Sequence, residues 1–155
     1  MSEYRAPIRD MQFVLKELAG LEELAKLPGC EEATPDVVDA VLEEAAKFAE
    51  EVLSPLNASG DKEGARFSEG KVTTPKGFKD AYAKFVESGW GTLSAPAAFG
   101  GQEMPHVIST AFQEYMISSN MASIVACALA FRARAERLFS SVAGAFRRAV
   151  CRIDA

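Results

Sequence analysis

The stretch from Gly89 to Pro105 constrains the fold more than any other part of the chain. It reads GWGTLSAPAAFGGQEMP and holds four glycines, two prolines and the only tryptophan. Gly89, Gly100 and Gly101 can adopt positive φ, and the two prolines fix φ near about −65°. We therefore expect an ordered, turn-rich loop that joins two regular elements.

The segments on either side of this loop have helical periodicity. Apolar residues recur at three- and four-residue steps in residues 8–27, 35–53, 78–89 and 105–120. Thr34–Pro35 and Thr74–Pro75 are typical helix starts. Gly20 is expected to interrupt the first helix, and Gly89 is expected to follow the end of the third. We expect Ser54–Pro55 to stop the second helix and residues 57–74 to form a surface loop with a short hairpin around 66–72. The last helix is expected to fray near residues 118–120. The predicted fold class is all-α, an up-and-down helical bundle.

Composition excludes several function classes. The net charge is −5 and the pI about 5.0, so no positive field favours nucleic acid. No apolar run reaches the length of a membrane span, and the charged N-terminus is not a secretory signal. The cysteines Cys30, Cys127 and Cys151 have neither disulfide-framework nor zinc spacing. We expect reduced thiols and a cytoplasmic protein.

Charge is unevenly distributed along the chain. Residues 1–122 carry eight lysines and three arginines against 20 acidic residues, a net of −9, whereas residues 123–155 carry six arginines and two acids, a net of +4. Such a break predicts a boundary, with a domain at 1–122 and an atypical Arg/Ala-rich tail at 123–155. The tail can be written as a basic amphipathic helix that could lie on an anionic membrane, pack on the core or contact a second chain.

Few residues suggest chemistry by themselves. His106, the single histidine, has no neighbouring partner for acid–base work, so we interpret it as a surface or loop-packing residue. Gly100–Gly101 before a helix could bind phosphate, but no strand precedes it, and a structural turn is the preferred interpretation. Paired acids such as Glu43–Glu44 lack histidines that would complete a metal site. The sequence assigns no catalytic, cofactor-binding or metal-binding residue.

The loop and the helix after it carry a family resemblance. Gly89–Trp90, Leu93, Pro96 and Phe99–Gly100–Gly101, followed by Gln113–Glu114, resemble the N-terminal helical domain of acyl-CoA dehydrogenases. The opening residues 4–7 are similar to a long bacterial branch that includes 3-methylmercaptopropionyl-CoA dehydrogenases. The resemblance covers residues 4–122. Glu103 departs from the pattern, because a glycine is common at that position.

The resemblance implies an FAD-dependent oxidoreductase. Members oxidise acyl-CoA at Cα–Cβ, with a glutamate base and FAD as hydride acceptor, and pass electrons to an electron-transfer flavoprotein; most are dimers or tetramers. It also implies that the flavin site and the base lie in later domains that this chain lacks. We therefore expect an inactive fragment without bound FAD, and Trp90, Phe112 and Met116 become candidates for a substrate-pocket wall. The structural-loop residues are Gly89, Pro96, Gly100 and Gly101.

Two further expectations follow. An apolar face left exposed in the fragment is expected to favour self-association, and residues 123–155 are interpreted as a frameshifted or otherwise aberrant tail. The alternative is a non-catalytic helical interaction module whose basic tail contacts a partner or membrane. Acyl-chain preference and oligomeric state cannot be inferred from the sequence.

Overall fold

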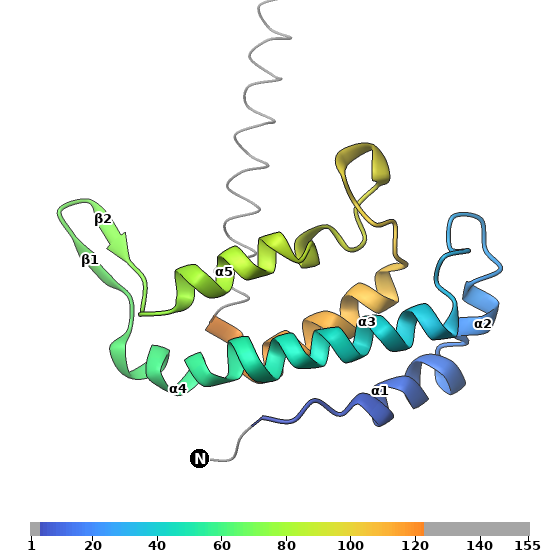
Figure 1. The fold of residues 1–155 in the computed structure, drawn as a ribbon, viewed down its shortest axis with the longest axis horizontal. Coiled ribbons are helices and arrows are strands. Elements are labelled where there is room, and N and C mark those ends of the chain that lie inside the picture. Colours follow the sequence, from blue (N-terminus) through green and yellow to red (C-terminus); the bar gives the residue numbers. More distant parts are fainter. Residues whose placement is uncertain (1–3, 123–155) are drawn as a thin grey trace, which may run out of the picture. The chain divides into compact units, whose positions relative to one another are not determined.

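The computed structural model describes residues 4–122, apart from the side chain of Phe99, and these residues belong to one compact unit. The predicted tail at 123–155 lies outside the described residues. Within residues 4–122 the chain forms an up-and-down helical bundle with one small hairpin, which confirms the predicted fold class (Figure 1). No helix among the described residues is long and apolar enough to cross a membrane.

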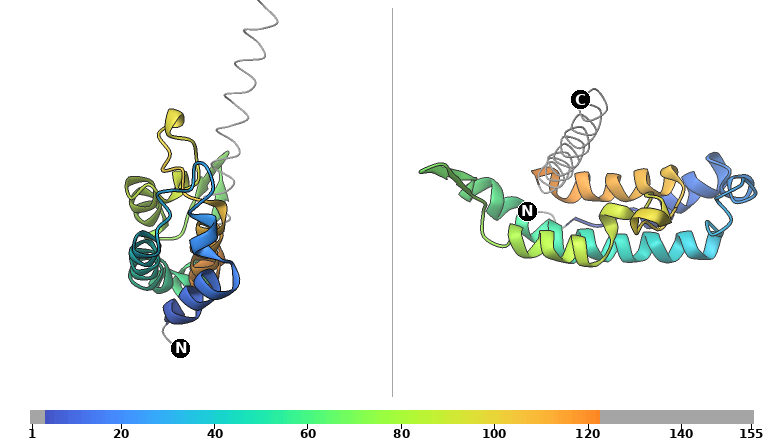
Figure 2. Two further views of the ribbon diagram at one scale, coloured as in Figure 1. Left: turned by 90° about the vertical axis from the view of Figure 1, so that its right-hand side faces the viewer. Right: turned by 90° about the horizontal axis from the view of Figure 1, so that it is seen from above.

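Four helical segments run alternately in opposite directions (Figures 1 and 2). The first is α1, Ile8–Phe13, which continues as a π-helical segment, Val14–Leu18, and is followed by the short α2, Leu21–Leu24. The second is a long continuous helix made of α3, a π-helical segment and α4, with bounds Pro35–Lys47, Phe48–Leu53 and Ser54–Glu63. The third is α5, Phe78–Glu87, and the fourth comprises residues 106–122.

One apolar face from each segment forms the core. The buried residues repeat at helical spacing, as the stripes in the sequence predicted. They include Met11 and Leu15 from the first segment; Val38, Leu42, Ala45, Ala49 and Leu53 from the second; Ala81 and Phe85 from α5; and Ile108, Ala111, Phe112, Tyr115 and Met116 from the last.

The first segment departs from its predicted stripe. Val14, Leu18 and Leu27 belong to the apolar pattern predicted over residues 8–27, but they are 43%, 70% and 54% exposed. The wider turn of the π-helical segment shifts the buried face after Val14, and Gly20 then ends the helix with φ at 67°. Leu21, which belongs to the same pattern, is buried as predicted, at 1% exposed.

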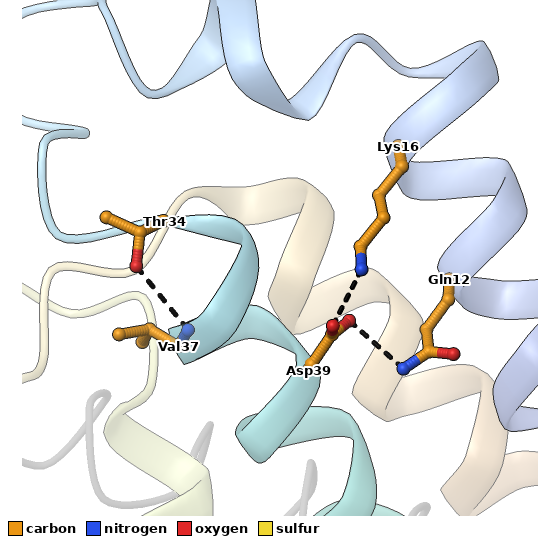
Figure 3. A network of polar contacts seen from close by, with 5 residues as sticks. All are labelled: Gln12, Lys16, Thr34, Val37 and Asp39. Atoms are coloured by element: carbon orange, nitrogen blue, oxygen red, sulfur yellow. Dashed lines mark hydrogen bonds and ion pairs between the residues drawn. The ribbon is translucent and has the colours of Figure 1, made fainter.

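The start of α3 follows local rules and is tied to α1. Thr34 caps the helix, because its hydroxyl accepts a hydrogen bond from the amide of Val37 at 3.4 Å, with a proline in the first turn. One turn further on, Asp39 accepts hydrogen bonds from Lys16 at 2.6 Å and from Gln12 at 3.0 Å (Figure 3). These two contacts hold the first two segments side by side.

The prediction that Ser54–Pro55 ends this helix was wrong. Pro55 lies in the first turn of α4, directly after the π-helical segment. Proline removes one backbone donor and crowds the preceding turn, and a π-helical turn is one way in which a helix accommodates such an interruption. Residues 57–63 are therefore helical rather than loop.

The hairpin was predicted correctly, but the start of α5 was not. Strands β1, Arg66–Ser68, and β2, Lys71–Thr73, pair antiparallel with Phe67 opposite Val72, and all six residues are exposed. Thr74 does not cap α5. The N-cap is Gly77, with φ at 87°, because a turn from Pro75 places the helix start three residues later.

The last helix does not fray where expected. Residues 106–122 are continuously helical, and Ser119 and Asn120 are buried. The side-chain amide of Asn120 donates a 3.1 Å hydrogen bond to the carbonyl oxygen of Leu53, 67 residues away in the chain. This long-range contact compensates for the weak helix propensity of the Ser-Ser-Asn run.

Candidate functional site

The loop between α5 and the last helix is built from backbone hydrogen bonds. Gly89 ends α5 as predicted, with φ at 72° and its amide bonded to the carbonyl of Val86 at 3.1 Å. Residues 101–104 of the loop then pair with residues 92–96 through backbone hydrogen bonds. The amides of Gly101, Gln102, Glu103 and Met104 donate to the carbonyls of Pro96, Thr92, Ala95 and Leu93 at 2.9–3.1 Å.

Gly100 and Gly101 are glycines for different physical reasons. Gly100 has φ at 76° and open space where a side chain would project. Gly101 is not in the left-handed region, but a methyl group on it would lie 1.9 Å from the carbonyl oxygen of Ala95. Pro96, with φ at −61° and ψ at 143°, starts the short 3-10 turn Ala97–Phe99, which Gly100 ends. The four predicted structural-loop residues therefore all lie at turns or close contacts.

Glu103 occupies the position where the family pattern favours glycine, and its backbone explains that preference. Its φ is 53°, a conformation that costs an L-residue about 1–2 kcal/mol. Its carboxylate accepts a hydrogen bond from the amide of Ala97 at 2.9 Å, which closes the tip of the loop. The departure from the pattern is thus compensated by a local contact.

An aromatic cluster anchors the loop to the bundle. Trp90 stacks on Phe112 with ring centroids 4.5 Å apart and an interplanar angle of 14°. Phe48 lies 6.3 Å from Trp90 and 6.4 Å from Phe85, and Phe85 in turn stacks on Phe112 at 6.3 Å. Offset and tilted aromatic pairs of this kind add to the free energy gained by apolar burial.

A groove of about 670 Å³ runs beside this cluster, between the long second helix and the end of α5. Its lining is mainly apolar and includes the rings of Phe48 and Trp90, together with several charged residues. The lining comprises Val37, Ala40, Val41, Glu44, Lys47, Phe48, Glu51, Val52, Lys84, Glu87, Ser88, Trp90, Leu93 and Gln102. A volume of this size suits a small-molecule ligand or one face of a peptide helix.

The structure separates the three predicted pocket-wall residues. Trp90 lines the groove, whereas Phe112 is 4% exposed and Met116 1% exposed, and neither belongs to the lining. Phe112 supports Trp90 from behind through the ring stack. Helical periodicity identified Phe112 and Met116 as apolar contacts, and Trp90 was identified as the tryptophan of the loop. Neither signal could identify which of the three side chains faces the groove. Gln102, which the sequence analysis did not select, lines the groove and donates to the carbonyl of Gly89 at 3.1 Å.

Neither the loop nor the groove offers a ready site for the pyrophosphate of FAD. A pyrophosphate is bound by free backbone amides or cations, but the amides of Gly100, Gly101 and Gln102 already donate to carbonyls within the loop. The groove rim carries Glu44, Glu51 and Glu87 against Lys47 and Lys84, and Lys47 is paired with Glu44. Among residues 4–122, moreover, no cluster of His, Cys, Asp or Glu could hold a metal ion.

Three proteins of known function are similar to part of this chain, whereas no protein-family model matches it. 3-Methylmercaptopropionyl-CoA dehydrogenase of Ruegeria pomeroyi is 40% identical over 118 residues, which cover 76% of this chain and 20% of that protein. A broad-specificity linear acyl-CoA dehydrogenase of Mycobacterium tuberculosis is 27% identical over 79% of this chain and 20% of its own length. Butyryl-CoA dehydrogenase of Syntrophomonas wolfei is 33% identical over 57% of this chain and 15% of its own. This chain thus spans about a fifth of the length of these relatives.

Proposed function

This chain belongs to the acyl-CoA dehydrogenase family. From this we propose that it is the helical part of an enzyme that dehydrogenates acyl-CoA at Cα–Cβ. The similarity to three enzymes named for acyl-CoA substrates carries this proposal. In the complete protein FAD would accept the hydride, and an electron-transfer flavoprotein would take the electrons. The residues described here would contribute shape and packing to that enzyme.

Trp90 is the residue that we assign to the wall of an acyl pocket. It is held between the loop and the bundle, and it presents an indole ring to the apolar groove. Phe112 and Met116 would act behind it, as a packed layer that fixes the ring in place. An aromatic wall of this kind suits the apolar chain of a thioester rather than its phosphate-bearing end.

Alone, the chain is expected to be catalytically inactive. The loop amides are already used, and the groove supports neither a pyrophosphate nor an assigned base. The test is flavin absorbance of the purified 155-residue chain together with dye reduction in the presence of acyl-CoA. Absence of both is expected; bound FAD with dye reduction would contradict the fragment interpretation.

The second candidate, an interaction module, predicts a different outcome in a separate assay. Large apolar side chains are exposed on the described part of the chain, among them Phe13, Leu18, Phe67 and Met121. Co-sedimentation with anionic liposomes that requires residues 123–155 would favour this candidate. Binding that is unchanged when those residues are deleted would count against it.

A further inference from the structure

Residues 4–7 precede α1 and belong to no helix or strand, and the chain turns at Pro7, where the Ile8 amide donates to the Ala6 carbonyl at 2.9 Å. Tyr4 and Ala6 are half-buried, whereas Arg5 and Pro7 are exposed, so one side of this segment is covered. One carboxylate, Glu50, holds this segment. It accepts a hydrogen bond from the Ala6 amide at 2.8 Å and contacts the Arg5 guanidinium at 3.4 Å.

Glu50 belongs to the π-helical segment Phe48–Leu53 and is only partly accessible, with 24% of its side chain exposed. An amide hydrogen bond to a carboxylate is about twice as strong as one to a neutral acceptor. The contact between Glu50 and the Ala6 amide is therefore the strongest identified attachment of residues 4–7 to the bundle.

Two phenol groups oppose this attachment. Tyr115, on the last helix, is completely buried, and neither its hydroxyl nor that of Tyr4 has a hydrogen-bond partner. Burial, followed by the nearby Tyr4 and Glu114, raises the pKa of Tyr115 to about 12. Burial, and then the charge of Glu50, also raise the pKa of Tyr4. The nearby side chain of Ser118 opposes this shift, but its geometry with the Tyr4 hydroxyl is not that of a hydrogen bond.

The bundle beneath residues 4–7 is held together independently of them. The Asn120 amide donates to the Leu53 carbonyl at 3.1 Å and directly joins the last helix to the end of the π-helical segment. Detachment of residues 4–7 would release the Glu50 contacts and allow water to reach the two phenols, while the Asn120 contact stays closed. Opening of this segment therefore does not require unfolding of the bundle.

We propose that residues 4–7 form a releasable strap, latched by Glu50 and weakened by the unsatisfied hydroxyls of Tyr4 and Tyr115, which opens and closes over the last helix. A closed strap gains a charge-assisted hydrogen bond and loses the hydration of two hydroxyls. These opposing contributions keep the open form within thermal reach of the folded chain. The device is independent of the catalytic role proposed above.

The test is native-state hydrogen exchange of the Ala6 amide in the full chain, with the amide of Leu42 in the core as the reference for global unfolding. Glu50→Gln keeps the shape of the acceptor and removes its charge, so Ala6 exchange should accelerate by about tenfold. Tyr4→Phe removes one unsatisfied hydroxyl, so Ala6 exchange should slow by a few fold. Both substitutions act on the closed form, so they should change Leu42 exchange by the same factor as Ala6 exchange. A local opening is recognised instead because Ala6 exchanges far faster than Leu42 in every variant and depends little on urea.

Glu51→Gln is the matched control, because Glu51 is the neighbouring exposed glutamate of the same π-helical segment and lines the groove instead. It should leave Ala6 exchange unaltered. The proposal is overturned if Ala6 and Leu42 are equally protected in the wild-type chain, if Glu50→Gln leaves Ala6 exchange unchanged, or if Tyr4→Phe accelerates Ala6 exchange.

Discussion

Replacement of Gly101 by alanine should destabilise the protein, although its backbone conformation alone would favour the opposite result. Gly101 lies outside the left-handed region, and at such positions Gly→Ala commonly stabilises by about 0.4–1 kcal/mol because the unfolded chain loses freedom. In this loop, however, the added methyl group would lie 1.9 Å from the Ala95 carbonyl oxygen and 2.2 Å from its carbonyl carbon. Ordinary C···O contacts begin at about 3.3 Å, so the loop segments that carry Ala95 and Gly101 must separate by more than about 1 Å.

The magnitude follows from what this separation breaks. The amide of Glu103 donates to the Ala95 carbonyl, and the amide of Gly101 donates to the Pro96 carbonyl, both at 3.1 Å. Loss of two hydrogen bonds at about 1 kcal/mol each, with some strain left in the loop, gives a destabilisation of about 2–4 kcal/mol. Gly100→Ala is the matched control: it has open space and φ at 76°, so it should cost only about 1–2 kcal/mol.

Urea unfolding measures both variants in one experiment. Trp90 is the only tryptophan and stacks on Phe112, so its fluorescence reports on the loop anchor, while far-ultraviolet circular dichroism reports on the bundle. Gly101→Ala should unfold at a lower urea concentration than Gly100→Ala by both signals. A Gly101→Ala midpoint at or above that of the wild type would refute the close-contact argument.

Three other predictions concern the bundle and the loop tip. Asp39→Ala should lower the free energy of unfolding by about 1 kcal/mol in urea titration, because its contact with Lys16 is about one-third exposed and is therefore weakened by solvent. Glu43→Ala, on the exposed face of the same helix, is the control and should have little effect. The free energy of unfolding should fall as the pH rises from about 10 to 12, because Tyr115 ionises first in the unfolded chain and only near 12 when folded. The contribution of Tyr115 to this loss is at most about 3 kcal/mol. The loss should be smaller in Tyr115→Phe, where the raised pKa of Tyr4 still contributes. Glu103→Ala should cost about 1 kcal/mol, because it keeps the strained φ and loses the Ala97 contact, whereas Glu103→Gly should be nearly neutral, a ranking that thermal melts can check.

Local signals predicted the elements whose causes are local. The Thr34 cap and Gly89 at the end of α5 each depend on one residue and its near neighbours, and both were predicted correctly. Pro55 was misread because a local rule predicts a helix end, while the structure keeps the helix through a π-helical turn. The contact that supports the last helix at Asn120 comes from Leu53, 67 residues earlier, which no short window can contain.

In the candidate site, too, features with local causes could be predicted from the sequence, whereas features that depend on the folded arrangement could not. The loop glycines were identifiable, yet the two reasons for the Gly100–Gly101 pair were not, because the contact of Gly101 with Ala95 requires the loop to close first. Likewise, Trp90 and Phe112 were both recognisable as apolar partners, but only the three-dimensional arrangement places one in the groove and the other behind it. Sequence periodicity gives the buried face of a single helix; a groove depends on how two helices and a loop meet.

The internal hydrogen bonding of the loop also indicates what this part of the family pattern does. A glycine-rich turn before a helix could offer its amides to a phosphate, but here the Gly100 and Gly101 amides bond to the Ala97 and Pro96 carbonyls. These two amides are not available for a ligand, and the two glycines serve the tight geometry of the loop. What the loop presents to the groove is instead the ring of Trp90, held by Phe112. In the function proposed above, we therefore expect this loop to position an apolar wall rather than to bind a phosphate group.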